Sequence, residues 1–248
     1  MINLNTESNS SLLQQVQQKQ ESIFEKLASG KKVNSAADGA AAQQIIDRLT
    51  TQVEGNRQSV ANAYDGVSLT QVAEGGLSGI NDDVSRIREL SVQAGNGILS
   101  DSDRQAIQAE VTQLQENISQ TIEQTEFGGQ SLLTNNDSIE FQVGANAGQK
   151  IGVATQDVAA SLTDVLNVDL STAQGAEEAL AVADEAAEFV GAARADLGAT
   201  QNQFESAARN LTQSNVNIAA ARSRIQDTDY AQATADSAAA NILGQAST

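Results

Sequence analysis

The sequence is poor in the residue types that carry out catalysis. It contains no histidine and no cysteine, which removes the commonest general base and the usual thiolate nucleophile. A serine–lysine pair could still form a nucleophile, but no lysine stands in a recognisable nucleophile motif. The lysines are Lys19, Lys26, Lys31, Lys32 and Lys150. We therefore expect no catalytic residues and no enzymatic activity.

Two short motifs carry groups that could bind a ligand. The stretch Asn81-Asp82-Asp83 resembles a carboxylate cluster, but on a helix these side chains fan around the axis, and no calcium loop with a central glycine follows. The stretch Glu74-Gly75-Gly76 is not a phosphate loop, because no strand precedes it and no Lys-Ser or Lys-Thr pair follows. We expect no metal site and no cofactor.

The charge of the chain excludes further classes of partner. Fourteen basic and 32 acidic residues give a formal net charge of −18, whereas binding to nucleic acid or anionic membranes needs clusters of Lys and Arg. No apolar run reaches the roughly 18 residues of a membrane-spanning helix. The N-terminus has neither the basic start nor the apolar core of a cleavable secretory signal. We expect no nucleic-acid partner, no membrane partner and no cleaved signal.

The composition favours long helices over a compact globule. Only 3% of the 248 residues are aromatic and none is proline; aromatic residues supply much of the buried area of compact cores, and proline breaks helices. Between about residues 41 and 95, apolar or small residues recur in steps of four and three. This first seam contains Leu49, Val53, Val60, Val67, Ile80 and Ile87. Some 55 residues would form a helix of roughly 80 Å, longer than an ordinary globular helix.

A second seam lies nearer the C-terminus, where large apolar residues repeat every seven positions and the positions three later are small. It contains Leu197, Phe204, Leu211, Ile218 and Ile225. Because a narrow stripe cannot bury itself, we expect the two seams to pair as antiparallel helices, with a third helix over 107–122. Alternating apolar residues predict a β-hairpin near 139–155 that lies on the helices. The predicted fold is mainly α: an elongated antiparallel bundle or coiled coil spanning 41–225, with a small β-hairpin.

The two ends of the chain form arms with few apolar anchors, residues 1–40 and 226–248. Each arm is too poor in apolar residues to offset the entropy of ordering, about 1–2 kcal/mol per residue. Such segments become ordered when many copies bury them together. We expect both arms to be disordered in the monomer, and the chain to be a self-assembling subunit.

Several segments in one order resemble bacterial flagellin. They are "LASGKKVNSAADGAAAQQI" (27–45), "NAYDGVSLTQVAEGGL" (62–77), "RIRELSVQAGNG" (86–97), "SDSDRQAIQAEV" (100–111), "TEFGGQSLL" (125–133), "FQVGANAGQ" (141–149), "RADLGATQNQFE" (194–205) and "ARSRIQDTDYA" (221–231). The resemblance covers nearly the whole chain. Residues 155–172 leave no room for extra surface domains, so the chain resembles a minimal flagellin.

The resemblance implies a structural subunit that polymerises into the flagellar filament and serves motility. The arms would line the inner tube, and 226–248 would be a shortened C-terminal arm. The implied partners are copies of the chain, the flagellar export chaperone, and the cap and junction proteins. The implied location is extracellular, in the flagellum, reached by export without a cleaved signal. The alternative is a hook–filament junction protein, which is similar at both ends.

The resemblance also implies a receptor surface. In flagellins, recognition by a host Toll-like receptor uses an Arg and a Leu of the long helix and a Glu of the next helix, which match Arg86, Leu90 and Glu110. Arg86 and Leu90 are four apart, so we expect them to share a helix face. The same surface could instead contact only a neighbouring subunit.

Overall fold

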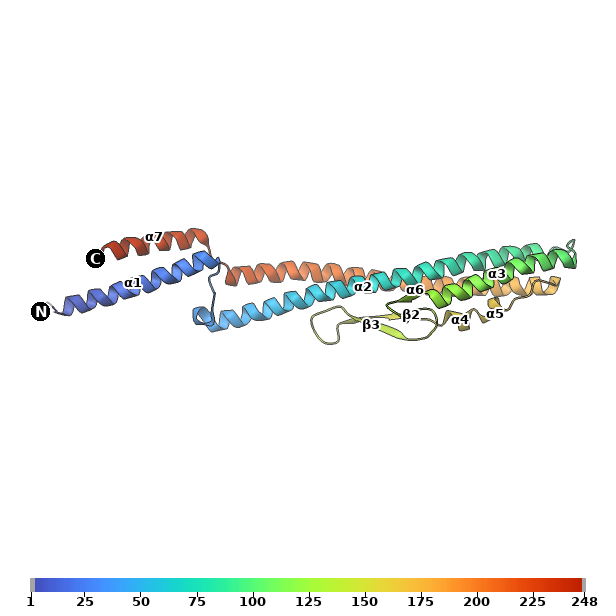
Figure 1. Ribbon diagram of the computed structural model, residues 1–248, viewed down its shortest axis with the longest axis horizontal. Helices are drawn as coiled ribbons and strands as arrows, with labels where there is room; N and C mark the ends of the chain where they lie inside the picture. Colours follow the sequence, from blue (N-terminus) through green and yellow to red (C-terminus); the bar gives the residue numbers. More distant parts are fainter. Residues whose placement is uncertain (1–2, 247–248) are drawn as a thin grey trace. The chain divides into compact units, whose positions relative to one another are not determined.

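The computed structural model describes residues 3–246, and the burial of side chains from residue 14 to residue 245. Residues 1–2 and 247–248 of the two predicted arms lie outside the described residues. The chain divides into two compact units, 1–57 with 212–248 and 58–211. The prediction of a mainly α fold with a small β-hairpin is confirmed (Figure 1).

Both long helices extend over most of their predicted ranges. The helices are α1 (Asn3–Ser29), α2 (Ala36–Ala94), α3 (Asp101–Gln124), α4 (Val158–Ser161), α5 (Thr163–Leu166), α6 (Ala173–Gln226) and α7 (Tyr230–Ala246). The strands are β1 (Glu126–Phe127), β2 (Gln130–Ser131), β3 (Ser138–Gln142) and β4 (Lys150–Ala154). Strand β1 pairs with β2, and β3 pairs with β4, each as an antiparallel hairpin.

Acidic side chains fix two helix starts. The Asp38 carboxylate accepts hydrogen bonds from the backbone N–H groups of Ser35 (2.8 Å) and Asn34 (3.0 Å), which lower its pKa. At α3, Ser100 and Asp103 form a reciprocal capping box, and hydrogen bonds from the Ser100 side chain and backbone lower the pKa of Asp103. Because the pKa of each carboxylate is lowered in the folded state, the two aspartates stabilise the fold at pH values above the ordinary aspartate pKa of about 3.9. The contribution disappears as pH falls through the lowered values.

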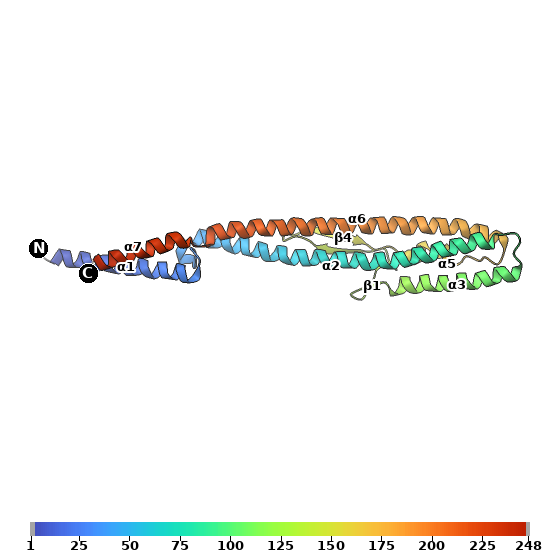
Figure 2. The same ribbon diagram turned by 90° about the horizontal axis from the view of Figure 1, so that it is seen from above.

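Within the unit 58–211, α2 and α6 pack side by side and antiparallel (Figures 1 and 2). Arg88 forms an ion pair with Asp184, and Glu74 lies 3.7 Å from Arg194. From the Glu74–Arg194 pair to the Arg88–Asp184 pair, the residue number rises in α2 and falls in α6, so the two helices run antiparallel. The helix α3 folds back on α2 after the turn that follows Ala94, as the sequence predicts.

Gly66 of α2 lies directly against the ring of Phe204 of α6. Phe204 is fully buried. A Cβ atom added at Gly66 would lie 2.5 Å from the Phe204 ring, whereas one added at Gly79 would meet nothing within 4 Å. Phe204 therefore needs a residue without a side chain at position 66.

These two glycines give a matched pair of substitutions with opposite expected signs. Gly66→Ala should lower the free energy of unfolding by about 1–3 kcal/mol, because the added methyl overpacks the Phe204 site. Gly79→Ala should raise it by about 0.5–1 kcal/mol, because alanine is the better helix former and the site is open. Urea denaturation of both variants measures this. Equal effects of the same sign would contradict the packing described.

The hairpin of β3 and β4 lies on the helices, as predicted. The ring of Phe141 meets the ring of Phe204 edge-on, at a centroid distance of 5.4 Å and an interplanar angle of 89°. The Asn62 side chain of α2 donates a hydrogen bond of 2.9 Å to the backbone carbonyl of Gln142. This aromatic contact, this hydrogen bond and the buried side chain of Val153 together attach the hairpin, which would be marginal alone.

The segment 155–172, which shows little hydrophobic periodicity, is ordered in the structure. It contains α4 and α5 and buries apolar side chains in the core of the unit: Val158, Leu162, Val165 and Leu170. Two glutamines of α3 hold its backbone. Gln115 Nε2 donates to the Val165 carbonyl (3.0 Å), and Gln108 Oε1 accepts from the Leu170 N–H (2.6 Å).

In the other unit, α1 and α7 lie side by side (Figures 1 and 2). The backbone N–H of Lys32 donates to the carbonyl of Gln226 (2.6 Å), and Gln20 Nε2 donates to Asn241 Oδ1 (2.9 Å). The Tyr230 hydroxyl donates to the Leu27 carbonyl at 3.2 Å. Both described arms are thus helical and linked by polar contacts. Their disorder in the isolated monomer stays a prediction.

Candidate functional site

Arg86 and Glu110 meet on the surface formed by α2 and α3. Arg86 Nη2 lies 2.7 Å and Nε 2.9 Å from Glu110 Oε1, and Arg86 Nη1 lies 2.9 Å from Glu89 Oε2. The hydrogen bonds that Arg86 donates to Glu110, and then the one that it donates to Glu89, raise the pKa of Arg86. The Arg86 and Glu110 side chains are about half exposed, at 47% and 48%. Two of the three predicted contact residues therefore form one charged surface.

Leu90, the third predicted contact residue, is not on this surface. It is only 1% exposed and belongs to the same buried cluster as Ile87 and Val84. The boundary of the core passes between Arg86 and Leu90, although the two residues are one helical turn apart. Of these two residues only Arg86 is exposed, and Leu90 lies in the core.

Each of the predicted seam residues is buried or partly buried. The buried ones are Val53, Ile80, Ile87, Leu197 and Phe204. The partly buried ones are Leu49, Val60, Val67, Leu211, Ile218 and Ile225. A pair of helices buries its facing stripe completely only where a further element covers the edge of the groove.

A buried arginine at the turn between α2 and α3 was not identified from the sequence. Arg104 is 7% exposed. Its guanidinium donates to three backbone carbonyls, those of Ala94 (3.0 Å), Leu99 (2.8 Å) and Asn96 (3.1 Å). The sequence does not distinguish Arg104 from an ordinary exposed helix arginine. Its three acceptors are backbone carbonyls, which every residue carries, so no acidic side chain marks its role.

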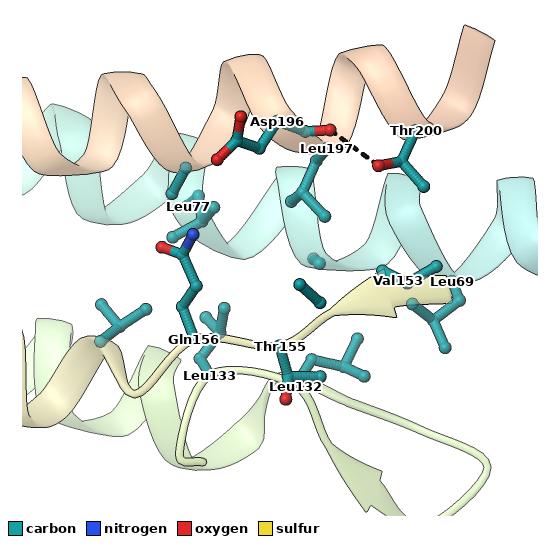
Figure 3. A pocket seen from close by; sticks show the side chains of 14 residues that line it. Leu69, Leu77, Leu132, Leu133, Val153, Thr155, Gln156, Asp196, Leu197 and Thr200 are labelled. Carbon is teal, nitrogen blue, oxygen red and sulfur yellow. Dashed lines mark hydrogen bonds between the residues drawn. The ribbon is translucent and has the colours of Figure 1, made fainter. Parts of the chain in front are cut away.

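A small apolar pocket lies between α2, α6, the segment after β2, and strand β4 with the residues that follow it (Figure 3). Its volume is ≈ 40 Å³. Apolar side chains from all these elements line it, including Leu69, Leu77, Leu132, Leu133, Val153 and Leu197. The Gln156 side chain extends into the pocket region toward Leu77 and Asp196, and its Oε1 atom is buried with no hydrogen-bond partner among the described residues.

The motif Asn81-Asp82-Asp83 of α2 belongs to no metal-binding cluster among the described residues. Burial, and then the charge of Asp82, raises the pKa of Asp83. Among residues 3–246, no cluster of three or more potential acidic ligands has metal-binding geometry. No helix in this described part of the chain is long and apolar enough to cross a membrane.

Family models match both ends of the chain. Residues 2–138 match the bacterial flagellin N-terminal helical region, and residues 180–248 match the bacterial flagellin C-terminal helical region. Among curated proteins, a flagellin of Halalkalibacterium halodurans is 37% identical over 227 residues, covering 90% of this chain and 84% of that protein.

Other relatives agree with these matches. A flagellin of Bacillus subtilis is 36% identical, covering 90% of this chain and 85% of that protein. A flagellar filament 30.7 kDa core protein of Treponema maltophilum is also 36% identical, with coverages of 90% and 84%.

Solved structures share the fold. The crystal structure of Bacillus cereus flagellin is similar with a TM-score of 0.57 and 28% identity, covering 65% of this chain and 94% of that one. A protein of Vibrio parahaemolyticus described as flagellar hook-associated has a TM-score of 0.65 at 13% identity, covering 77% of this chain and 100% of that one. At that identity the second likeness concerns the fold alone.

Proposed function

Because the chain belongs to the bacterial flagellin family and is a structural subunit of the extracellular flagellar filament, we propose that it polymerises with copies of itself through its terminal regions, 1–40 and 226–248. The observation that carries the proposal is the apolar surface that α1 and α7 leave uncovered: Phe24, Tyr230, Ile242 and Leu243 are each more than half exposed. Copies that bury these side chains against one another gain hydrophobic free energy.

Seeded polymerisation watched by electron microscopy tests this function. Purified chain added to filament seeds should elongate them into long tubes. Persistent monomer would contradict the proposal. It would favour the hook–filament junction protein, which is present in few copies and does not polymerise alone.

For the arms, we predict disorder in dilute monomer over about residues 1–40 and from about residue 226 onward. Limited proteolysis should trim both arms and leave a resistant fragment containing residues 58–211. The physical reason is the low number of apolar anchors in each arm, set against the entropy of ordering. Arms that resist protease in dilute monomer, at the rate measured for assembled filaments, would overturn this prediction.

The proposed location and export route complete this function. The chain would leave the cell unfolded through the flagellar export channel, without a cleaved signal, and would meet the export chaperone and the cap and junction proteins. A chain without cysteine forms no disulfide that could obstruct such a passage. We propose a structural role for the chain, without catalytic activity.

A second candidate function is contact with a host Toll-like receptor. The observation that favours it is the Arg86–Glu110 ion pair, whose two side chains are about half exposed and so accessible to a partner protein. The buried Leu90 would support this surface from below. The alternative is that the pair contacts only a neighbouring subunit in the filament.

Substitution of Arg86 together with Leu90 tests the receptor contact. Arg86→Ala/Leu90→Ala monomer should lose receptor signalling in a reporter-cell assay, because the charged donor and its apolar support are both removed. Arg88→Ala is the matched control, since Arg88 pairs with Asp184 of α6 and should keep its signalling. Circular dichroism checks that each variant is folded. Unchanged signalling by the folded double variant would refute the contact.

A further inference from the structure

The turn between α2 and α3 contains an asparagine followed by a glycine, Asn96-Gly97, the only such pair in the sequence. The turn faces solvent: Asn96 and Gly97 are exposed, and the next residue, Ile98, is 87% exposed. An asparagine side chain can react with the backbone nitrogen of the residue that follows it. Glycine hinders this nitrogen least, because it has no Cβ atom. The turn therefore holds both reactants of a reaction within the chain.

The hydrogen bonds of the turn keep these two reactants close together. The Leu99 N–H donates to the Asn96 carbonyl at 3.1 Å and so closes the turn. The Ile98 N–H donates to Asn96 Oδ1 at 3.3 Å. This second hydrogen bond spans Gly97, so the side-chain amide of Asn96 lies beside the Gly97 backbone, and the bond withdraws electrons from the amide carbon. Among the described residues, the Gly97 N–H donates to no acceptor, so its nitrogen is not engaged elsewhere.

We propose that Asn96 is a site of spontaneous modification, which loses its amide in the folded protein and becomes an isoaspartate bound by Arg104. In the first step the Gly97 nitrogen bonds to Asn96 Cγ and gives up its proton. The bond from Cγ to Nδ2 breaks, ammonia leaves with that proton, and a cyclic imide remains. In the second step water adds to one of the two imide carbonyls. The bond from this carbonyl to the Gly97 nitrogen breaks, the nitrogen takes back a proton, and a carboxylate forms. Water is the co-reactant, and no atom is oxidised or reduced.

The turn also selects which imide carbonyl reacts with water. The backbone carbonyl of Asn96 accepts from two donors, the Leu99 N–H and Arg104 Nη2, each at 3.1 Å. When water attacks this carbonyl, negative charge develops on its oxygen, and donors that are already in place stabilise that charge. Attack here converts the backbone carbonyl into a free carboxylate and leaves the chain connected through Cγ. That product is isoaspartate.

The new carboxylate forms beside a buried arginine that has few charged neighbours. The guanidinium of Arg104 donates to uncharged carbonyls, and its ion pair with Asp101 is long, at 3.9 Å. A carboxylate in place of the Asn96 carbonyl gives Arg104 a charge-assisted hydrogen bond. Each modified copy of the chain therefore gains one negative charge at this turn, and its main chain becomes one carbon longer there.

Incubation of the folded chain at neutral pH for several weeks tests the site. Peptide mass spectrometry measures the conversion of each asparagine, and an isoaspartate-specific methyltransferase identifies the product. Residue 96 should convert about tenfold or more faster than Asn146, an exposed asparagine that is followed by alanine. An intact Asn96 in the folded chain, or a rate equal to that of Asn146, would overturn the proposal.

Gly97→Ala is the matched control variant. A Cβ atom added at position 97 meets nothing within 4 Å, so the folded turn accepts alanine. The methyl group hinders the attacking nitrogen and should slow the conversion of Asn96 by about tenfold or more. Circular dichroism checks that the variant is folded. An unchanged rate in the folded variant would show that the Gly97 nitrogen is not the nucleophile, against the proposal.

The ratio of isoaspartate to aspartate tests the role of Arg104. The same chain in denaturing urea has lost the contact between Arg104 and the Asn96 carbonyl, so its ratio should be lower by about twofold or more. Equal ratios would refute the selection by Arg104, and conversion in urea alone would show that the fold protects Asn96. These measurements use the unassembled chain, so their outcome does not depend on the filament function.

Discussion

Arg104→Leu should lower the free energy of unfolding by about 2–4 kcal/mol, because it removes three charge-assisted hydrogen bonds. Among the acceptors is the carbonyl of Ala94, a fully buried residue at the end of α2. Without the guanidinium, that carbonyl has no replacement donor and little access to water. The positive charge also lies at the negative end of the α2 dipole, which adds to the loss.

Urea denaturation followed by circular dichroism measures this effect. Arg104→Lys is the informative control, because it keeps the charge but cannot reach three carbonyls with one planar group. It should recover part of the loss. An Arg104→Leu midpoint equal to that of the unsubstituted chain would show that the three hydrogen bonds contribute nothing net to stability.

Phe204→Ala should have the largest effect of any single substitution considered, a loss of about 3–5 kcal/mol. The ring is fully buried, fills the space above Gly66 and meets Phe141 edge-on. Its removal leaves a cavity and removes the aromatic contact between the hairpin and α6. Phe141→Ala should cost less, because Phe141 is only partly buried.

A double substitution makes this prediction specific to the packing. On its own, Gly66→Ala should destabilise, but in the Phe204→Ala background it should become neutral or stabilising, since the ring that opposed the methyl is gone. Thermal or urea unfolding of the four proteins gives the coupling energy. Additive effects would contradict direct contact between positions 66 and 204.

Much of the fold follows from the sequence because its helices are long and periodic. The step of seven through Leu197 and Phe204 predicts a seam that the structure contains along α6. Short elements give no such signal. The segment from Val158 to Leu170 contains helices of four residues, too short to show a period, and its order depends on Gln108 and Gln115, which lie 50 or more positions away.

The candidate surface was predicted less completely for a related reason. The charges of Arg86 and Glu110 are visible in the sequence, and the structure brings them together. Spacing alone cannot say on which side of the core boundary Leu90 lies, because third elements such as α3 widen the buried stripe of α2. The exposed Ile98 and the buried Arg104 invert the usual preferences of their residue types. Only tertiary contacts show such inversions.

The turn held by Arg104 has a consequence for the conditions under which subunits meet. An arginine guanidinium stays charged at every pH that a protein encounters, and its three acceptors here are uncharged carbonyls. Acid that protonates carboxylates weakens surface ion pairs such as Arg86–Glu110 and the capping box of Ser100 and Asp103, but it leaves the three hydrogen bonds of Arg104 in place. A filament that passes from neutral into acidic water therefore keeps the three hydrogen bonds that tie this turn together in each subunit.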